Sequence, residues 1–264
     1  EDRETTVIDA NYSGRVMRLS AMSSALVENL TITNGYIEGS SGGGVDITNS
    51  QNVVLNNLLI SNNTCFMPGF QDGNSGGAFN QGGGVHIYSS SVKINNSKFI
   101  NNNADGGAAL SFSSSGGVQK LEISDTEITG NSGHMSVISS WVNTTSEIGY
   151  ETILNNVIVN NNSLTGSWGA IIKNQNSIVR VNNCNLTSNN GNGGVIAGFG
   201  QDSTSIMNSI IWSNSENLEL STNGSMGYTN WDGLDRNNDN NNSSDYFLVY
   251  NDITGASEIK EMND

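Results

Sequence analysis

The chain repeats a nine-residue pattern: an apolar residue, any residue, Asn, two of any kind, an apolar residue, two of any kind, and Asn. The first copy runs from Val27 to Gly35. The later copies are Leu55 to Asn63, Ile94 to Asn102, Ile123 to Asn131, Leu154 to Asn162, Val181 to Asn189 and Ile206 to Asn214. Their starts lie 28, 39, 29, 31, 27 and 25 residues apart. Such a period indicates a solenoid, in which each repeat forms one coil.

The two asparagine positions of the repeat have a physical use in stacked coils. An Asn at a corner between strands can adopt a left-handed backbone or hydrogen-bond the chain locally. Stacked coils also place identical side chains about one strand spacing apart, so that amides can bond along a ladder. The first position is Asn in every copy except the fourth, which has Asp125, and the second is Asn in every copy except the first, which has Gly35.

Two further short apolar segments lie between successive copies. One follows glycines, as in Gly42 to Ile47, Gly82 to Ile87 and Gly106 to Leu110. The other leads into the next copy, as in Val92 to Ile94. β-Branched residues dominate these positions, as strands prefer, and no segment shows a 3.6-residue period. We therefore predict an all-β parallel β-helix of about seven coils with three short strands each; a propeller needs longer repeats, and a β-sandwich would lack the asparagine columns.

Two motifs relate this pattern to known proteins. Gly106-Gly107-Ala108-Ala109 and Phe99-Ile-Asn-Asn102 resemble the repeats of polymorphic outer-membrane proteins, which combine Gly-Gly-Ala-apolar with Phe-x-x-Asn. The segments from Arg3 to Asn11 and from Asn208 to Asn214 also resemble the right-handed β-helix family of secreted bacterial proteins with the pectin-lyase-like fold. The resemblance covers residues 3 to 215 and implies a right-handed coil and a bacterial protein at the cell surface or outside the cell. It is specific for fold and weak for function, because this fold carries lyases, hydrolases, adhesins and tail spikes.

Composition and charge limit the classes of binding partner that this chain could have. The net charge is −15, from 25 acidic and 10 basic residues, which argues against nucleic acid and against an anionic membrane surface. No apolar run reaches 18 residues, so we expect no membrane insertion. The start at Glu1, directly before a strand-like segment, suggests a piece of a longer chain or assembly.

The repeat also divides the chain. Residues 1–215 form the predicted β-helix, and residues 216–264, which lack the repeat, are predicted to form a C-terminal cap or junction with an Asn/Asp-rich loop. Cys65 and Cys184 lie four coils apart, about 19 Å, which is too far for a disulfide, so two free thiols are expected.

Catalytic candidates are few. Aligning the glycine-led strands places Asp46 and His86 at one outward position of successive coils, with Tyr88 and, further along, Lys173 on the next outward column. An acid, an imidazole and a phenol one coil apart could transfer protons; a solvated polar face predicts the same residues. The related pectin hydrolases carry Asn-Thr-Asp, Asp-Asp, Gly-His-Gly and Arg-Ile-Lys motifs, and none of these occurs in this sequence.

A metal and a ligand surface are also candidates. Calcium takes closely spaced carboxylate and amide oxygens in a loop, and such a loop follows the repeats; the same composition is typical of an acidic linker. Its candidate ligands are Asp232, Asp235, Asn237, Asp239, Asn241 and Asp245. Aromatic binding candidates are Phe66 and Phe70, in the insertion between the second and third copies, and Trp212 at an outward position.

Three functions remain open from the sequence. The first is a binding, adhesive or structural module that contacts glycan or protein at the cell exterior. The second is a polysaccharide lyase or glycoside hydrolase, which rests on fold analogy. The third is a subunit of a filament or tail spike.

Overall fold

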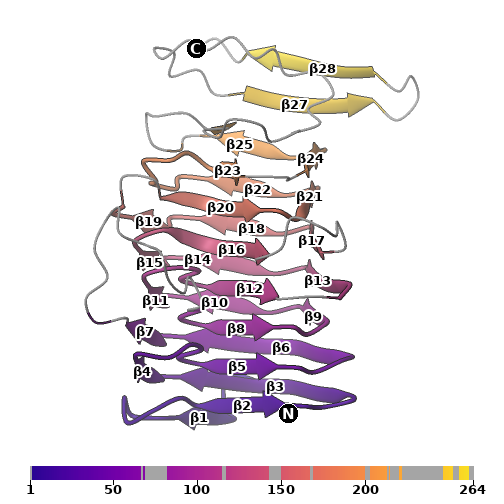
Figure 1. The fold of residues 1–264 in the computed structure, drawn as a ribbon. Helices are drawn as coiled ribbons and strands as arrows, with labels where there is room; N and C mark the ends of the chain where they lie inside the picture. Colours follow the sequence, from indigo (N-terminus) through magenta and orange to yellow (C-terminus); the bar gives the residue numbers. More distant parts are fainter. Residues whose placement is uncertain are drawn as a thin grey trace.

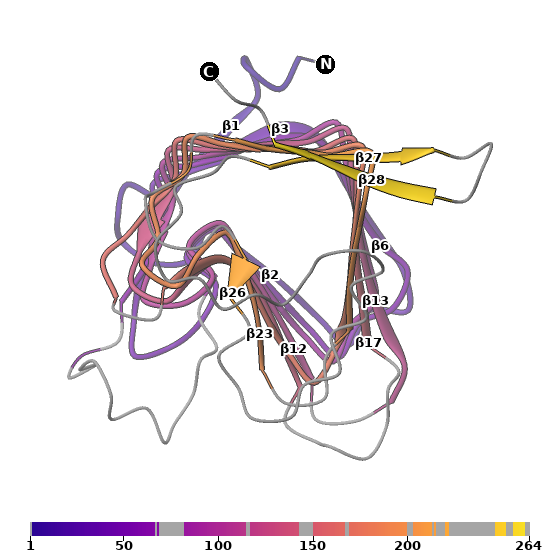
Figure 2. The same ribbon diagram turned by 90° about the horizontal axis from the view of Figure 1, so that it is seen from above.

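A computed structural model of the chain describes residues 2–66, 68, 82–114, 117–142, 150–166, 169–199, 203–212, 214, 220–221, 246–251 and 256–261. Every regular element in these ranges is a β-strand. The chain runs from left to right along the near face of Figure 1, returns along the far face and rises one strand at each turn. Viewed from above in Figure 2, this path defines a right-handed parallel β-helix, as predicted. The described residues contain no helix that is long and apolar enough to cross a membrane.

Three sheets form the walls of the β-helix. The largest has 15 strands and follows the order β24-β21-β17-β13-β9-β6-β10-β14-β18-β22-β25-β27-β28, with β3 paired to β6 and β1 to β3. Its strands are β1 (Val7–Asp9), β3 (Ala25–Thr33), β6 (Val53–Ser61), β9 (Val92–Asn95), β10 (Lys98–Ile100), β13 (Gln119–Ser124), β14 (Glu127–Thr129), β17 (Tyr150–Asn155), β18 (Ile158–Asn160), β21 (Ile178–Asn182), β22 (Asn185–Thr187), β24 (Ser203–Met207), β25 (Ile210–Trp212), β27 (Tyr246–Asn251) and β28 (Ala256–Glu261).

The other two sheets complete each coil. The eight-stranded sheet contains β2 (Met17–Ser20), β5 (Val45–Thr48), β8 (Val85–Tyr88), β12 (Leu110–Ser114), β16 (Ser136–Val142), β20 (Ala170–Gln175), β23 (Ile196–Phe199) and β26 (Leu220–Ser221), in that order. The five-stranded sheet contains β4 (Tyr36–Glu38), β7 (Thr64–Phe66), β11 (Asn103–Ala104), β15 (Ser132–Gly133) and β19 (Ser163–Leu164).

The strand register confirms the phase of the repeat. The first apolar positions of all seven copies pair in one column: Val27, Leu55, Ile94, Ile123, Leu154, Val181 and Ile206. The second apolar positions form a parallel column: Ile32, Ile60, Phe99, Ile128, Val159, Leu186 and Ile211. Nearly all of these side chains are buried in one continuous apolar core, so the repeat marks the inward face of the largest sheet.

The first asparagine column bends the largest sheet. All seven residues have a φ between 47° and 59°, including Asp125. Asn and Asp tolerate this left-handed conformation better than other residues with a side chain, because their short polar groups bond locally. β3 and β6 continue through the bend as single strands, whereas later coils divide there into two short strands.

The second asparagine column forms a buried amide ladder. In Asn102, for example, Nδ2 donates to Asn131 Oδ1 at 3.0 Å in the next coil and to Ile60 O at 2.9 Å in the preceding coil. The backbone N of Asn102 donates to the same Asn131 Oδ1 at 2.9 Å. The pattern continues from Asn63 to Asn214. Here the left-handed residue is the one before the ladder position, such as Asn101 or Asn161, a corner that the sequence did not reveal.

Gly35 begins the ladder because the backbone leaves no room for a side chain. A Cβ there would lie 2.0 Å from Gly43 O. Its backbone N donates directly to Asn63 Oδ1 at 2.9 Å.

Both cysteines are buried and free, as predicted. Cys184 packs within the apolar core, and Cys65 Sγ donates to Ser40 O at 2.8 Å. Burial raises the pKa of Cys65 to about 12 and that of Cys184 to about 11.

Parallel stacking changes at the C-terminal end. β27 pairs antiparallel with β25, and β28 pairs antiparallel with β27 (Figure 1). The outer edge of β25 is therefore paired with β27, and its backbone groups do not need a further parallel coil as a partner.

Candidate functional site

The eight-stranded sheet carries a column of polar side chains on the side away from the core. From β5 to β20 the column reads Asp46, His86, Ser111, Ser139 and Lys173, each residue directly paired in register with the next. All five side chains are buried. The structure thus confirms that Asp46 and His86 are neighbours in one column.

Asp46 is the best-connected member of this column. Its Oδ1 accepts from His86 Nδ1 at 2.8 Å, and its Oδ2 lies 3.3 Å from Arg18 Nε and 3.6 Å from Arg15 Nη1. The Arg15 side chain is also fixed by the carbonyls of Gly42 and Ser41. A buried carboxylate requires such partners, because desolvation of an unpaired charge is costly.

The sequence placed Lys173 wrongly. It belongs to the Asp46 column, whereas Tyr88 lies on the next outward column, paired with Thr48 and Ser113. The His86 and Tyr88 rings stack with centroids 6.5 Å apart. Burial lowers the pKa of Lys173 from 10.5 to about 8.

Ser111 was missed by the sequence reasoning because the glycine motif of that coil was aligned one residue too early. The structure places Gly107, not Gly106, in the left-handed position, with φ of 62°. Gly42 and Gly82 occupy the same position four residues before Asp46 and His86. Counting four residues from each left-handed glycine would have added Ser111 to the column.

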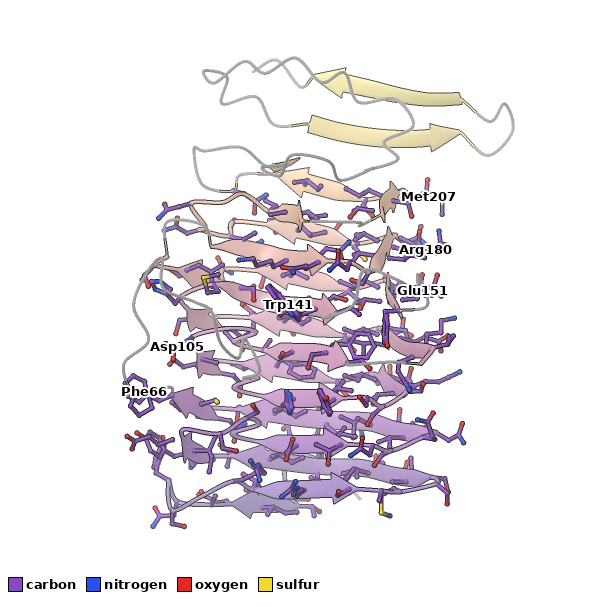
Figure 3. All side chains as sticks on the ribbon, in the orientation of Figure 1. Phe66, Asp105, Trp141, Glu151, Arg180 and Met207 are labelled. Atoms are coloured by element: carbon purple, nitrogen blue, oxygen red, sulfur yellow. The ribbon has the colours of Figure 1, made fainter. Side chains whose placement is uncertain are left out.

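The aromatic candidates do not come together. Phe66, at the end of β7, is 45% exposed and lies at the edge of the solenoid in Figure 3. Phe70 lies outside the described residues. Trp212 ends β25, but its side chain is not described. Of these three candidates, only Phe66 has a described side chain, so the structure does not bring them together as a binding surface.

The calcium candidates Asp232, Asp235, Asn237, Asp239, Asn241 and Asp245 lie outside the described residues. Among the residues that are described, no group of three or more His, Cys, Asp or Glu side chains could hold a metal ion. Calcium binding remains a prediction from the sequence.

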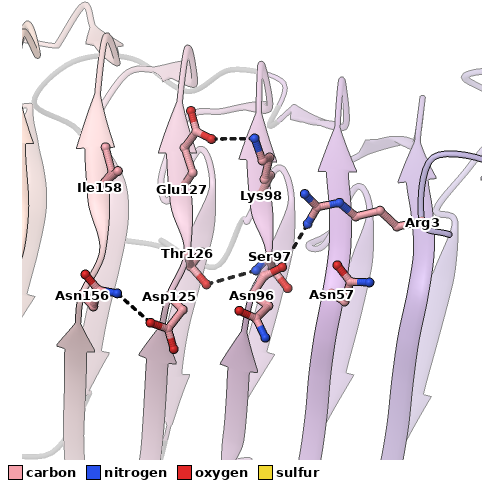
Figure 4. Close-up of a pocket in the computed structure, with 10 residues that line it drawn as sticks. All are labelled: Arg3, Asn57, Asn96, Ser97, Lys98, Asp125, Thr126, Glu127, Asn156 and Ile158. Atoms are coloured by element: carbon pink, nitrogen blue, oxygen red, sulfur yellow. Dashed lines mark hydrogen bonds and ion pairs between the residues drawn. The ribbon is translucent and has the colours of Figure 1, made fainter.

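A polar groove that the sequence did not predict follows the bend of the largest sheet (Figure 4). Its volume is about 460 Å³, and its base is a row of side chains from the first asparagine column in four successive coils: Asn57, Asn96, Asp125 and Asn156. The remaining lining residues are Arg3, Ser97, Lys98, Thr126, Glu127 and Ile158. The sequence signal was the column itself, which predicted corner residues and an amide ladder between coils rather than a groove.

The groove is electrically balanced. Its two cationic residues, Arg3 and Lys98, face two carboxylates, Asp125 and Glu127. Lys98 Nζ lies 2.9 Å from Glu127 Oε2, and Arg3 Nη1 donates to the backbone O of Asn96 at 3.0 Å. A locally neutral groove on a chain of net charge −15 favours a neutral, polar ligand.

Hydrogen-bonding capacity remains at the base of the groove. Asn156 Nδ2 donates to Asp125 Oδ1 at 2.7 Å, and both residues are exposed. The Asn96 side chain is also exposed, and its amide makes no hydrogen bond with any residue that the structure describes. One amide or carboxylate therefore recurs in every coil, at intervals of about 4.8 Å.

A second row of charges follows the outward face of the largest sheet. Lys120 Nζ lies 2.7 Å from Glu122 Oε1 and 3.6 Å from Glu151 Oε2, and Arg180 Nε lies 2.6 Å from Glu151 Oε1. Lys93 binds the other oxygen of Glu122. The hydrogen bond from Lys120 lowers the pKa of Glu122. Glu151 and Arg180 lie one above the other in Figure 3; since each carboxylate is paired with cations, this row supports the sheet rather than offering catalytic acids.

No family model matches this chain, and neither a curated protein nor a solved structure was found to be similar to it.

Proposed function

We propose that this β-helix is an extracellular binding module that holds a neutral glycan along the groove of Figure 4. The observation that carries the proposal is the row of Asn57, Asn96, Asp125 and Asn156, which presents amide and carboxylate groups at a constant interval along the β-helix axis. A polysaccharide is also a repeating chain, and its hydroxyl groups both donate and accept hydrogen bonds. A ladder of side chains that do the same is complementary to it.

Charge and size agree with this ligand. The groove volume of about 460 Å³ is within the range of small-ligand sites. The balance of Arg3 and Lys98 against Asp125 and Glu127 disfavours a strongly anionic or cationic polymer. The location outside the cell follows from the resemblance to secreted β-helix proteins and is part of the proposal.

The groove offers modest affinity at each coil. Ile158 is the only apolar lining residue, so hydrogen bonds must provide most of the binding free energy. Each hydrogen bond contributes about 1 kcal/mol of net binding free energy. One bond to each side chain of the row therefore gives a dissociation constant on the order of 1 mM for a short oligosaccharide. Longer chains should bind more tightly, because they contact more coils.

The test uses neutral oligosaccharides of increasing length, such as cello- and xylo-oligosaccharides, titrated by NMR or calorimetry. The double variant Asn96→Gly and Asn156→Gly removes two amides of the groove, and glycine adopts the left-handed backbone of both positions without strain. We expect it to weaken binding by about three- to tenfold for each lost hydrogen bond.

Asn183→Gly is the matched control. Asn183 is an exposed, left-handed residue of the same column, but it does not line the groove. The proposal is wrong if no neutral oligosaccharide binds, or if the control weakens binding as much as the double variant does.

A further inference from the structure

The polar column on the eight-stranded sheet contains an Asp–His–Ser arrangement on three neighbouring strands. Asp46 on β5 pairs in register with His86 on β8, and His86 pairs with Ser111 on β12. Successive residues of such a column point to the same side of the sheet, about 4.8 Å apart. All three are at least nine-tenths buried, with exposed fractions of 4%, 5% and 0%.

The hydrogen bond to Asp46 determines which ring nitrogen carries the hydrogen in the neutral imidazole of His86. A carboxylate oxygen only accepts, so Nδ1 of His86 is the donor across the 2.8 Å contact with Asp46 Oδ1. Nε2 then carries the lone pair. Because the ring turns Nδ1 toward β5, it turns Nε2 away from β5, on the side where β12 carries Ser111.

Two buried atoms at this place have no partner. His86 Nε2 and Ser111 Oγ each expose less than 1 Å² and make no hydrogen bond. An unsatisfied buried polar group costs about 1–3 kcal/mol, so such atoms are uncommon in folded proteins. Here an acceptor nitrogen and a hydroxyl donor occur on adjacent strands of one column, which points to a bonding partner that joins them during function.

Gly42 and Gly107 allow the backbone to lie close to the side chains of Asp46 and Ser111. A Cβ on Gly42 would lie 2.9 Å from the Cβ of Asp46, and one on Gly107 would lie 2.8 Å from the Cβ of Ser111. Both glycines have positive φ values, so the chain can fold back against these side chains only because glycine occupies the position.

We propose that Ser111 is a nucleophile for ester hydrolysis, with His86 as its general base and Asp46 as the residue that orients the imidazole. Serine Oγ forms a bond to the carbonyl carbon of a small carboxylic ester, and its proton passes to His86 Nε2. The bond between that carbon and the alkoxy oxygen then breaks, and the departing alcohol takes the proton from Nε2.

Water completes the cycle. It attacks the acyl group on Ser111 while Nε2 accepts one of its protons; the acid is released, and Oγ recovers its proton. Arg15 and Arg18 hold the second oxygen of Asp46 in place, which keeps the first directed at Nδ1. His86 Nε2 and Ser111 Oγ are not hydrogen-bonded to each other in the structure, and in catalytic sites such a bond often forms or tightens only when substrate is present.

The proposal is independent of glycan binding, because the column lies on the eight-stranded sheet whereas the groove follows the bend of the largest sheet. Figure 2 shows these two sheets as separate walls of the β-helix. Loss of one activity would leave the other untouched.

The test is covalent labelling of the native full-length chain with a small alkyl fluorophosphonate, followed by mass spectrometry of the labelled peptide, together with hydrolysis of p-nitrophenyl acetate. We expect the label on Ser111 and none on Ser111→Ala. His86→Gln should slow labelling by about a hundredfold or more, since it removes the general base.

Ser139→Ala is the matched control, because Ser139 occupies the next place in the same column but has no histidine beside it. It should be labelled at the wild-type rate. Absence of label on Ser111 in the native wild-type protein overturns the proposal, as does a His86→Gln variant, folded by circular dichroism, that labels at the wild-type rate.

Discussion

Replacing Asn131 by alanine tests whether the amide ladder stabilises the β-helix. Asn131 Oδ1 accepts from both the backbone N and Nδ2 of Asn102, at 2.9 and 3.0 Å. Its own Nδ2 donates to Asn162 Oδ1 and to Phe99 O, both at 3.0 Å. Alanine leaves two buried donors of Asn102 without an acceptor. Each unsatisfied buried group costs about 1–3 kcal/mol, so the free energy of unfolding of the variant should fall by about 2–6 kcal/mol. This is a large share of the 5–15 kcal/mol that is typical of a folded domain.

The assay is urea denaturation followed by circular dichroism, with amide hydrogen exchange to show which coils open. Exchange is needed because solenoids can unfold in parts rather than in one step. Protection should fall most in the coils that contain Asn102, Asn131 and Asn162, since the lost bonds join those three.

Asn156→Gly is the comparison variant. Asn156 belongs to the exposed column, makes one side-chain bond, to Asp125, and has a φ of 55°, which glycine adopts freely. The free energy of unfolding of Asn156→Gly should fall by at most about 1 kcal/mol. If Asn131→Ala were no more destabilising than Asn156→Gly, the buried ladder would not be a source of stability.

Three further outcomes are expected. Because burial lowers the pKa of Lys173 from 10.5 to about 8, the unfolded chain binds more protons than the folded one between these values, and stability should rise with pH across this window by up to about 3 kcal/mol; equal pH slopes for the wild type and Lys173→Met in urea denaturation would contradict this. Cys65 and Cys184 should resist thiol reagents until the protein is denatured, since both are buried with raised pKa values; a mass shift on the native protein would count against it. Calorimetry with calcium should give heat for the wild type and less for Asp235→Ala and Asp239→Ala, and the absence of heat in the wild type would end the calcium prediction.

The sequence predicted the fold in detail because a solenoid stacks the same positions at every coil. Its period gave the coils, and the apolar positions of its nine-residue pattern became the two register columns that begin at Val27 and Ile32. The separation of Cys65 and Cys184 followed from that count. Handedness came from the resemblance, since a period is the same for either hand.

Side-chain neighbours across the eight-stranded sheet were harder to predict, because a shift of one residue changes which column and which face a side chain occupies. Asp46 and His86 were paired correctly, since both coils carry the same glycine-led segment. Lys173 and Ser111 were not, because their coils depart from that segment and only the strand register aligns them.

By itself the sequence determined the stacking into coils, the inward apolar columns and the two asparagine columns, because these depend on local backbone preference and on a repeat that is visible along the chain. The tertiary structure alone decided how those columns are used. It buried one as a hydrogen-bonded ladder and exposed the other as the base of a groove. It also brought Ser111 beside the Asp46–His86 pair, from a position 25 residues beyond His86 in the chain. Such contacts between coils depend on the register in which neighbouring strands pair, and this register cannot be seen from the order of residues along the chain.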